Sequence, residues 1–163
     1  MPRPDEELLR RLRESSGLRL DREGRFLHQG TPVEHARTLA VLRAGLHRAE
    51  DGRWATRIGP DWAYVDVEDA ARFVRRIEPR AAALRGQLAT GEWVEIDPAT
   101  LASGADDALY VRLPDGERAR LTRPAQVSLL PFLAESGDAF ELRLGERAFP
   151  IGKDEGREPV RKT

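Results

Sequence analysis

The stretch Leu20-Asp21-Arg22-Glu23-Gly24, followed by Thr31-Pro32 and an apolar run that ends near Gly52, decides how this chain is interpreted. It combines a polar turn, short alternating segments and a proline that opens a run with helical spacing. This order predicts two strands followed by a helix. The hairpin Arg53–Ile58 and Trp62–Val67 follows, around the turn Gly59-Pro60-Asp61. The first half is therefore predicted to be a strand–strand–helix–strand–strand unit.

The same order recurs later in the chain, at Leu113-Pro114-Asp115-Gly116 and then at Arg123-Pro124. Matched positions keep offsets of 92 residues and then 86 residues: Gly24 with Gly116, Pro32 with Pro124, and Trp54–Gly59 with Phe140–Gly145. The recurrence predicts an internal duplication. Related half-domains commonly meet at an interface, and interfaces are frequent places for a ligand or partner.

Composition limits the function classes. The chain has 163 residues, 40% of them apolar, which suits one domain or two small ones. Charged residues make up 34% with a net charge of −1, and this balance argues against general nucleic-acid binding. The absence of cysteine excludes disulfides and thiolate chemistry.

The sequence shows no targeting or membrane signal. No stretch approaches the roughly 20 apolar residues of a membrane span. Residues 1–7 are charged and lack the apolar segment of a signal peptide. We therefore expect a cytoplasmic protein.

An α+β fold is predicted, with two tandem strand–strand–helix–strand–strand units and a central β-hairpin. Thr31, Pro32 and Glu34 predict the start of the first helix, with Thr31 as its N-cap. The expected segments are an N-terminal helix (1–17, read from Pro4–Ser16), the first unit (18–80), a central hairpin with a polar connection (81–107), the second unit (108–152) and a disordered tail (153–163).

One segment fits two kinds of secondary structure, and one predicted helix contains a proline. Residues 69–77 fit a helix by composition, but Phe73, Val74 and Ile77 equally fit a strand. The second helix is predicted over Pro124–Glu135, and Pro131 should kink or shorten it.

Asp21–Phe73 resembles a bacterial family called domain of unknown function 1285. The matching sequence motifs are Asp21-Arg22-Glu23-Gly24-Arg25-Phe26-Leu27-His28-Gln29-Gly30-Thr31-Pro32-Val33, then Glu50-Asp51-Gly52 and Val67-Glu68-Asp69-Ala70. A weaker similarity continues to about Gly152. The resemblance implies a duplicated α+β fold whose second half is superficially pleckstrin-homology-like. It also implies a groove between the halves for a nucleotide-like ligand, a role in signalling, and a strand over Phe73–Glu78.

The sequence departs from the family's pattern in places. Asp61-Trp62 stands where many members carry Glu-Lys, and Ala71 stands where a proline often follows the Val-Glu-Asp-Ala word. If that lysine neutralises a ligand anion, Trp62 weakens the nucleotide interpretation.

The loop from His28 to Thr31 is the main candidate site. It precedes the predicted helix N-terminus, where free N–H groups attract anions, and Arg25 lies close in sequence. Arg25, His28, Gln29 and Thr31 could hold a phosphate or carboxylate. The alternative, which the capping pattern favours, is that Thr31 and Glu34 already satisfy those N–H groups.

Glu68 and Asp69 could orient these donors. Adjacent strand residues point to opposite faces, so a structural role for one of them is the stronger alternative to chemistry. His28, His35 and His47 lack metal-ligand spacing. Trp54, Trp62 and Trp93 could stack a base, but tryptophans in a domain of this size usually pack in the core.

We therefore expect a non-enzymatic regulatory module that binds a small, nucleotide-like or phosphorylated ligand between its two units. Arg25, His28, Gln29 and Thr31 are its predicted donors, with Glu68 or Asp69 orienting them. No catalytic group, metal or cofactor is expected, because no nucleophile–base pair, P-loop or metal pattern occurs. The alternative is a protein-interaction module without a ligand, which would expose a contiguous apolar patch.

Overall fold

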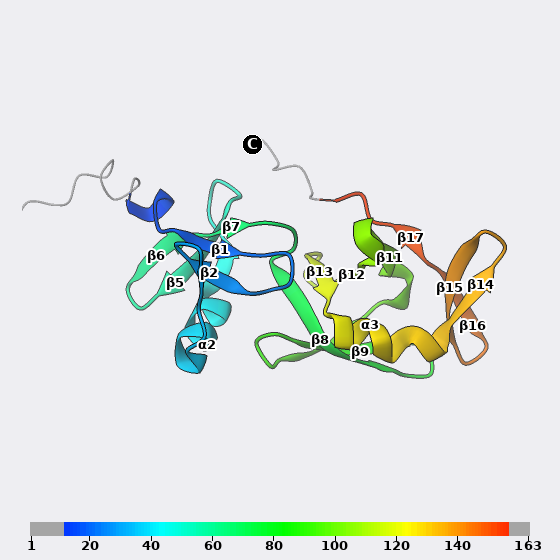
Figure 1. Ribbon diagram of the computed structural model, residues 1–163. Coiled ribbons are helices and arrows are strands. Elements are labelled where there is room, and N and C mark those ends of the chain that lie inside the picture. Colours follow the sequence, from blue (N-terminus) through cyan, green and yellow to red (C-terminus); the bar gives the residue numbers. More distant parts are fainter. Residues whose placement is uncertain (1–11, 157–163) are drawn as a thin grey trace, which may run out of the picture. The chain divides into compact units, whose positions relative to one another are not determined.

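The computed structural model describes residues 12–156, which form two compact units (Figure 1). The first unit contains residues 12–71 and the second contains residues 72–156. The boundary thus lies between Ala71 and Arg72 rather than after residue 80. The predicted N-terminal helix lies mostly outside the described residues, and Leu12 to Glu14 are helical.

The first unit has two small sheets and one described helix of ten residues. One sheet has the strand order β3-β2-β1-β7 and the other has the order β4-β5-β6. The elements are β1 (Leu18–Leu20), β2 (Phe26–His28), β3 (Thr31–Pro32), α2 (Ala36–Gly45), β4 (Leu46–Arg48), β5 (Trp54–Ile58), β6 (Asp61–Tyr64) and β7 (Asp66–Val67).

The predicted helix start at Thr31 is wrong. Thr31 and Pro32 form β3, which pairs antiparallel with β2 through His28↔Thr31 and Leu27↔Pro32. Gln29 and Gly30 make the two-residue turn, with φ angles of 51° and 82°, the positive values that such hairpin turns require. The helix begins later, where the ring of His35 accepts the backbone N–H of Thr38. The proline causes no conflict because β3 is an edge strand.

Helix α2 packs on one face of the sheet β4-β5-β6. Leu46 and Thr56 are cross-strand partners, so their side chains share that face. The buried hydroxyl of Thr56 donates to the carbonyl oxygen of Leu42 at 2.8 Å, which satisfies it inside the core. The interior of the first unit also contains the buried side chains of Leu20, Phe26, Ala55, Val65 and Val67.

Gly45 lets the end of α2 approach β5 closely. A Cβ atom there would lie 2.3 Å from the carbonyl oxygen of Arg57 and 2.8 Å from its nitrogen. Both atoms belong to the backbone, so no side-chain rotation could relieve the contact. The chain then enters β4 without a loop, because Leu46 is both the helix C-cap and the first strand residue.

The second unit contains a seven-stranded sheet and a three-stranded sheet, in the orders β10-β9-β8-β13-β12-β11-β17 and β14-β15-β16. Its strands are β8 (Arg72–Pro79), β9 (Leu84–Leu88), β10 (Trp93–Ile96), β11 (Ala102–Ser103), β12 (Leu109–Arg112), β13 (Arg118–Leu121), β14 (Leu133–Ser136), β15 (Ala139–Leu144), β16 (Arg147–Pro150) and β17 (Gly152–Lys153). Its helices are η1 (Pro98–Thr100), η2 (Ala105–Asp107), α3 (Arg123–Leu129) and η3 (Leu130–Phe132).

The central hairpin is part of this sheet rather than a separate connector. β9 and β10 pair antiparallel, as predicted, and β8 pairs with both β9 and β13. The strand expected over Phe73–Glu78 is confirmed by β8, whose residues Phe73, Val74 and Ile77 are buried. The polar connection expected over 97–107 instead contains two short helices, a strand and the buried Leu101.

Pro131 shortens the second helix, as predicted. α3 ends at Leu129, and the chain continues as the single 3₁₀ turn η3, in which Pro131 needs no N–H donor. Leu129 is fully buried in the core of the second unit. Other members of that core come from the large sheet and from β15: Val74, Leu84, Ile96, Val111, Leu121, Leu142 and Leu144.

The C-terminal segment is ordered as far as it is described, which corrects the predicted loose tail from residue 153. β17 pairs parallel with β11, with Ser103 opposite Lys153. Asp154 then accepts two hydrogen bonds from Arg118, from Nε at 2.9 Å and from Nη2 at 2.6 Å. Both side chains are only 10% exposed.

The chain is therefore an α+β protein with far more strand than helix. Each unit contains a hairpin, then a helix, then an antiparallel three-stranded meander. In the first unit these elements are β1-β2, α2 and β4-β5-β6. In the second unit they are β12-β13, α3 and β14-β15-β16.

Candidate functional site in the first unit

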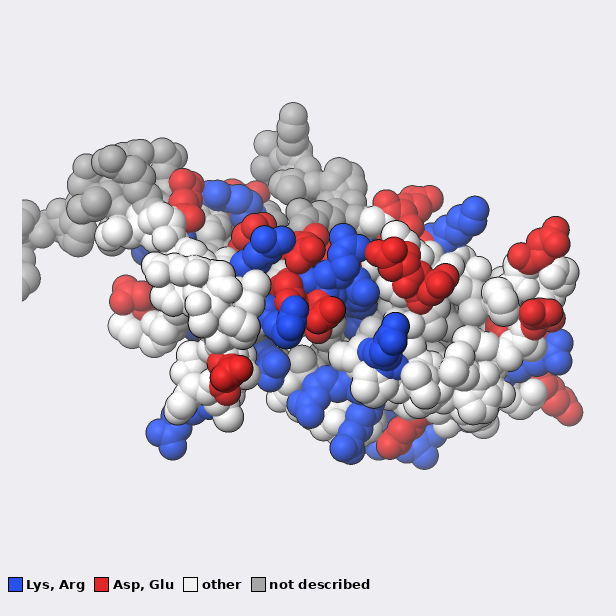
Figure 2. Space-filling view, viewed as in Figure 1, with Lys and Arg blue, Asp and Glu red and all other residues white. Residues whose placement is uncertain are grey.

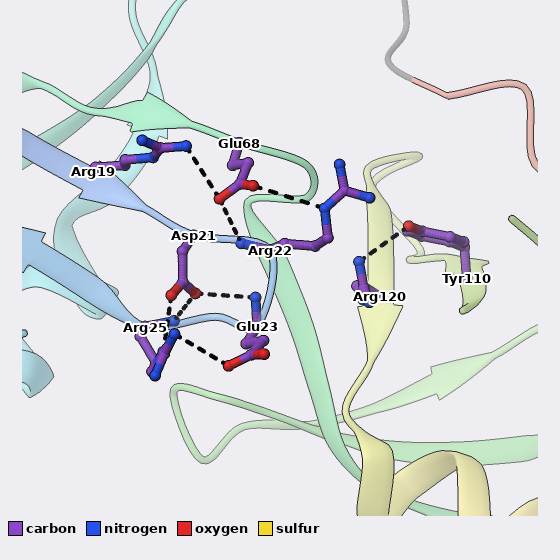
Figure 3. A network of polar contacts seen from close by, with 8 residues as sticks. All are labelled: Arg19, Asp21, Arg22, Glu23, Arg25, Glu68, Tyr110 and Arg120. Atoms are coloured by element: carbon purple, nitrogen blue, oxygen red, sulfur yellow. Dashed lines mark hydrogen bonds and ion pairs between the residues drawn. The ribbon is translucent and has the colours of Figure 1, made fainter. Parts of the chain in front are cut away.

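The turn between β1 and β2 is held by the buried carboxylate of Asp21 (Figure 3). Its Oδ1 accepts the backbone N–H groups of Glu23 and Arg25 at 3.0 and 2.8 Å. Its Oδ2 accepts Nε of Arg25 at 2.8 Å. Burial alone would raise the pKa of Asp21, but these donors outweigh it and hold the pKa below its usual value. Arg25 therefore serves the turn.

We predict that Asp21→Asn lowers the free energy of unfolding at pH 7 by about 1–3 kcal/mol. The folded-state pKa is depressed, so the carboxylate stabilises the fold above the unfolded value near 4, and this contribution is lost as the pH falls through the folded value. Urea unfolding at pH 7 and pH 3 should show the wild type and the variant converging at the lower pH. Asp115→Asn is the matched control, because exposed Asp115 accepts a single turn N–H, from Glu117.

The carboxylate of Glu68 accepts a hydrogen bond and forms ion pairs with residues of the same hairpin (Figure 3). Its Oε2 accepts the backbone N–H of Arg22 at 3.2 Å and lies 3.3 Å from Nη2 of Arg19. Its Oε1 lies 3.8 Å from Nε of Arg22. The arginines that Glu68 contacts are thus Arg19 and Arg22, and not Arg25, which was predicted as a donor that Glu68 would orient. Asp69 is half-buried and already has an interaction partner.

The six predicted site residues do not form one cluster. His28, Gln29 and Thr31 lie at the β2–β3 turn, which is the end of the hairpin near Gly17. Arg25 and Glu68 lie at the opposite end, near Asp21 and Leu20. The β2–β3 turn is also not a helix N-terminus, because α2 begins at Ala36. The anion attraction expected from a helix dipole is therefore absent at His28 and Thr31.

A hollow of about 510 Å³ lies beside this hairpin, and we call it the Arg19 hollow. Arg19, Leu27 and Asp66 are cross-strand partners on β1, β2 and β7, so their side chains share the face that lines it. Other lining residues include Gly30 in the β2–β3 turn, Arg53 just before β5, Trp54 in β5 and Tyr64 in β6. The hollow therefore lies within the first unit, next to the predicted loop.

The wall of the Arg19 hollow is braced by Arg53. Its Nε lies 2.8 Å from Oδ2 of Asp51, its Nη2 lies 3.1 Å from Oε1 of Glu14, and its guanidinium stacks on the Tyr64 ring at 3.7 Å. The Tyr64 hydroxyl donates to the same Asp51 oxygen at 2.7 Å. Two carboxylates and the Tyr64 ring therefore hold the Arg53 guanidinium in place, so Arg53 shapes the wall and its charge is already compensated.

The ionisation states in this cluster follow from its hydrogen bonds. The carboxylate of Asp51 raises the pKa of Arg53 above its usual value. Burial, with donation to Asp51, raises the pKa of Tyr64. Burial opposes the ionised form of Asp51, but the donors from Tyr64 and Arg53 hold the pKa of Asp51 below its usual value. Asp51 and Arg53 therefore stay charged and Tyr64 stays neutral near pH 7.

Arg19 is the cation that the hollow leaves available. Its side chain is 49% exposed, and among residues 12–156 its one carboxylate partner is Glu68, at a single nitrogen. A guanidinium has five N–H donors, so several remain for a ligand. Charges of both signs are mixed across the face drawn in Figure 2, so recognition depends on single groups rather than on a broad field.

The three tryptophans are not core residues, so the expectation that they pack in the core is wrong. Trp54, Trp62 and Trp93 are each only partly buried. Each lies under an arginine, at 4.5 Å from Arg48, 4.1 Å from Arg13 and 4.9 Å from Arg85. Trp54 lines the Arg19 hollow and presents an aromatic surface there.

Two absences hold for the part of the chain that the structure describes. Residues 12–156 contain no group of three or more histidine or acidic side chains placed to hold a metal. Among the same residues, no helix is long and apolar enough to cross a bilayer.

Sequence reasoning missed Arg19, Arg53 and Tyr64. Arg19 sits in an alternating strand, so its exposure was predictable, but its neighbour Asp66 comes from a parallel strand 47 residues later. The Asp51-Gly52-Arg53 turn was visible, and its polar residues could have marked the Arg53 cluster. Nothing local in the sequence signals the contact of Arg53 with Tyr64.

Comparison with known proteins identifies the fold. No protein-family model and no curated protein matches the chain. The structure is similar to the crystal structure of a DUF1285 family protein from Silicibacter pomeroyi, with a TM-score of 0.63, 21% identity, and coverage of 85% of this chain and 81% of that one. It is also similar to a DUF1285 family protein from Shewanella baltica, with a TM-score of 0.54, 19% identity, and coverage of 72% and 92%. The chain therefore has the fold of these DUF1285 family proteins, as the matching sequence motifs suggested.

Proposed function

We propose that this protein is a non-enzymatic module that binds a small anionic, nucleotide-like ligand in the Arg19 hollow and acts in signalling. The observation that carries the proposal is one hollow of about 510 Å³ that holds both Arg19 and Trp54. Small-molecule sites commonly span about 300–1,000 Å³ and combine apolar walls with a few polar groups. A guanidinium suits a phosphate or carboxylate, and an indole suits a base.

In this proposal the loop from His28 to Thr31 forms part of the rim of the hollow. Gly30 lines the hollow, and His28, Gln29 and Thr31 flank it in the same turn. Glu68 orients Arg19 through the 3.3 Å ion pair. Arg25 contributes indirectly, by holding the β1–β2 turn with Asp21.

We predict that Arg19→Ala weakens binding of such a ligand about tenfold or more, as expected for loss of one charge-assisted contact. Thermal-shift screening with nucleoside monophosphates and other phosphorylated metabolites should first identify a compound that raises the melting temperature. Calorimetry with that compound then measures the effect of Arg19→Ala.

Arg80→Ala is the matched control, since Arg80 is also exposed and also pairs with one carboxylate, that of Glu78 at 3.1 Å. It lies in the second unit and should leave the affinity unchanged. A screen without any stabilising compound, or an equal loss in both variants, would remove the proposal.

A duplicated origin of the two units is part of the same proposal. The shared order of hairpin, helix and meander supports it, together with the sequence offsets of 92 and then 86 residues. In this view the first unit recognises the ligand. The second unit, whose pleckstrin-homology-like character is a proposal as well, is the scaffold.

A protein-interaction module is the second candidate function. Val127 and Leu130, three residues apart in α3 and η3, are 56% and 61% exposed. Phe140, in the same unit, is 54% exposed. Apolar side chains of this size on a surface favour a partner when they are contiguous. The thermal-shift screen separates the two functions, because only the ligand module changes its melting temperature with a small molecule.

A further inference from the structure

A second hollow of about 520 Å³ lies on the face of the β4-β5-β6 sheet opposite α2, and we call it the Arg57 hollow. The strand register places the side chains of His47, Ala55 and Tyr64 in one row and those of Arg57 and Trp62 in the next. Cross-strand partners share a face, so all five point away from Leu46 and Thr56, which pack beneath α2. His47, Arg57, Trp62 and Tyr64 line the hollow.

Two guanidinium groups flank Trp62, and neither has a carboxylate partner among residues 12–156. Arg57 is its cross-strand partner, and the Arg13 guanidinium lies 4.1 Å from the centre of its ring. Within residues 12–156 neither arginine side chain forms a hydrogen bond or an ion pair. A pair of uncompensated cations beside one indole favours an anion there.

The acidic residues nearby do not neutralise these cations. The carboxylate of Asp51 is engaged by Arg53 and Tyr64. Asp61 precedes Trp62 in β6, so its side chain points to the opposite face. Glu50 also lines the hollow, but it lies in the β4–β5 turn. The four residue-to-residue steps from Arg53 to Arg57 span about 13 Å of extended chain, which separates that turn from Arg57.

His47 adds an oriented ring to the same surface. Its Nδ1 lies 2.7 Å from the carbonyl oxygen of Gly45, which can only accept, so Nδ1 carries the proton of this hydrogen bond. Nε2 is then the ring nitrogen left for a ligand. The backbone contact also fixes the plane of the imidazole.

We propose that the Arg57 hollow is a second binding site, for a small anion carried on a planar ring. Arg57 and Arg13 hold the anionic group, and the ring packs against Trp62. This site is separate from the Arg19 hollow: Tyr64 lines both, but the cations that would hold the two ligands are different. The inference therefore stands whether or not the proposed function is correct.

Titration with phenyl phosphate and with benzoate, followed by the indole N–H signals in ¹H–¹⁵N NMR spectra, tests the proposal. The signal of Trp62, assigned with Trp62→Leu, should shift with at least one probe, while the Trp93 signal should not. The two probes separate phosphate from carboxylate as the preferred anion. Inorganic phosphate should bind at least tenfold more weakly than phenyl phosphate, because it lacks the ring.

Arg57→Ala should weaken binding at least tenfold, and Arg57→Lys should recover part of that loss. Arg147→Ala is the matched control, because Arg147 is exposed and likewise has no ion-pair partner within residues 12–156. Arg19→Ala should also leave this titration unchanged, which separates it from the Arg19 hollow. An unmoved Trp62 signal with both probes, or an equal loss in Arg57→Ala and Arg147→Ala, would overturn the proposal.

Discussion

Asp154→Ala should lower the free energy of unfolding of the second unit by about 3–5 kcal/mol, because it removes the carboxylate that accepts two hydrogen bonds from a buried guanidinium. Arg118 and Asp154 form two parallel hydrogen bonds, and both side chains are only 10% exposed. The guanidinium also stacks on the Tyr110 ring at 3.9 Å, so it cannot easily turn toward solvent. Urea unfolding followed by circular dichroism measures the loss.

The penalty should come from the guanidinium charge that stays buried without Asp154, rather than from the missing contact alone. Arg118→Met combined with Asp154→Leu should therefore be more stable than Asp154→Ala, since no buried charge remains. Glu78→Ala is the control, because Glu78 pairs with Arg80 where both side chains are about half exposed, and such pairs contribute little. If Asp154→Ala costs no more than Glu78→Ala, the Arg118–Asp154 pair is not a stabilising element.

Gly45→Ala should destabilise the first unit by about 3 kcal/mol, the upper end of the usual cost of overpacking. The new Cβ would lie 2.3 Å from the carbonyl oxygen of Arg57, a distance that real structures do not tolerate. Relief requires moving the end of α2 away from β5, which also disturbs the Thr56–Leu42 hydrogen bond. Thermal and urea unfolding of the variant check this.

Gly152→Ala is the control for Gly45→Ala. Gly152 also has a conformation open to other residues, and a Cβ atom there would meet no atom within 4 Å. Its replacement should therefore change the unfolding free energy by less than about 1 kcal/mol. Similar losses at both positions would show that the close approach at Gly45 is not the cause.

Alternation and turn residues predicted most of the strands. Leu109, Val111 and Leu113 around Pro114–Gly116, and Phe140, Leu142 and Leu144 before Gly145, all lie where expected. In β15 the end of the strand follows the rule that one face is buried and the other is not, since Leu142 and Leu144 are buried and Arg143 is exposed, whereas Phe140 is exposed and β12 is buried on both faces. The helix-ending effect of Pro131 was equally local, because it needs only the missing N–H.

The helix start was mispredicted because two local patterns competed. Thr31, Pro32 and Glu34 match a capping box, but Gln29-Gly30 can also adopt the positive φ angles of a tight hairpin turn. Pairing of Val33 N–H with the Phe26 carbonyl oxygen, at 2.8 Å, extends the β3 interaction. Tertiary pairing thus decided between the two, and the candidate loop lost its helix dipole as a result.

The candidate site could be predicted only in part. Gly30 lines the Arg19 hollow, and Glu68 orients Arg19 through their ion pair. Arg19, Arg53 and Trp54 are brought together by β1, β5 and β7, which are distant in sequence. Such contacts depend on parallel pairing between β1 and β7, and a single sequence gives no direct signal for that register.

The position of β17 has a consequence for solubility. β11 would otherwise be the last strand of the seven-stranded sheet, and its unpaired N–H and C=O groups could template pairing with another molecule. β17 covers that edge with only two residues, and the ion pair of Asp154 follows it at once. We therefore expect loss of the Arg118–Asp154 pair to expose the β11 edge as well, and so to increase aggregation.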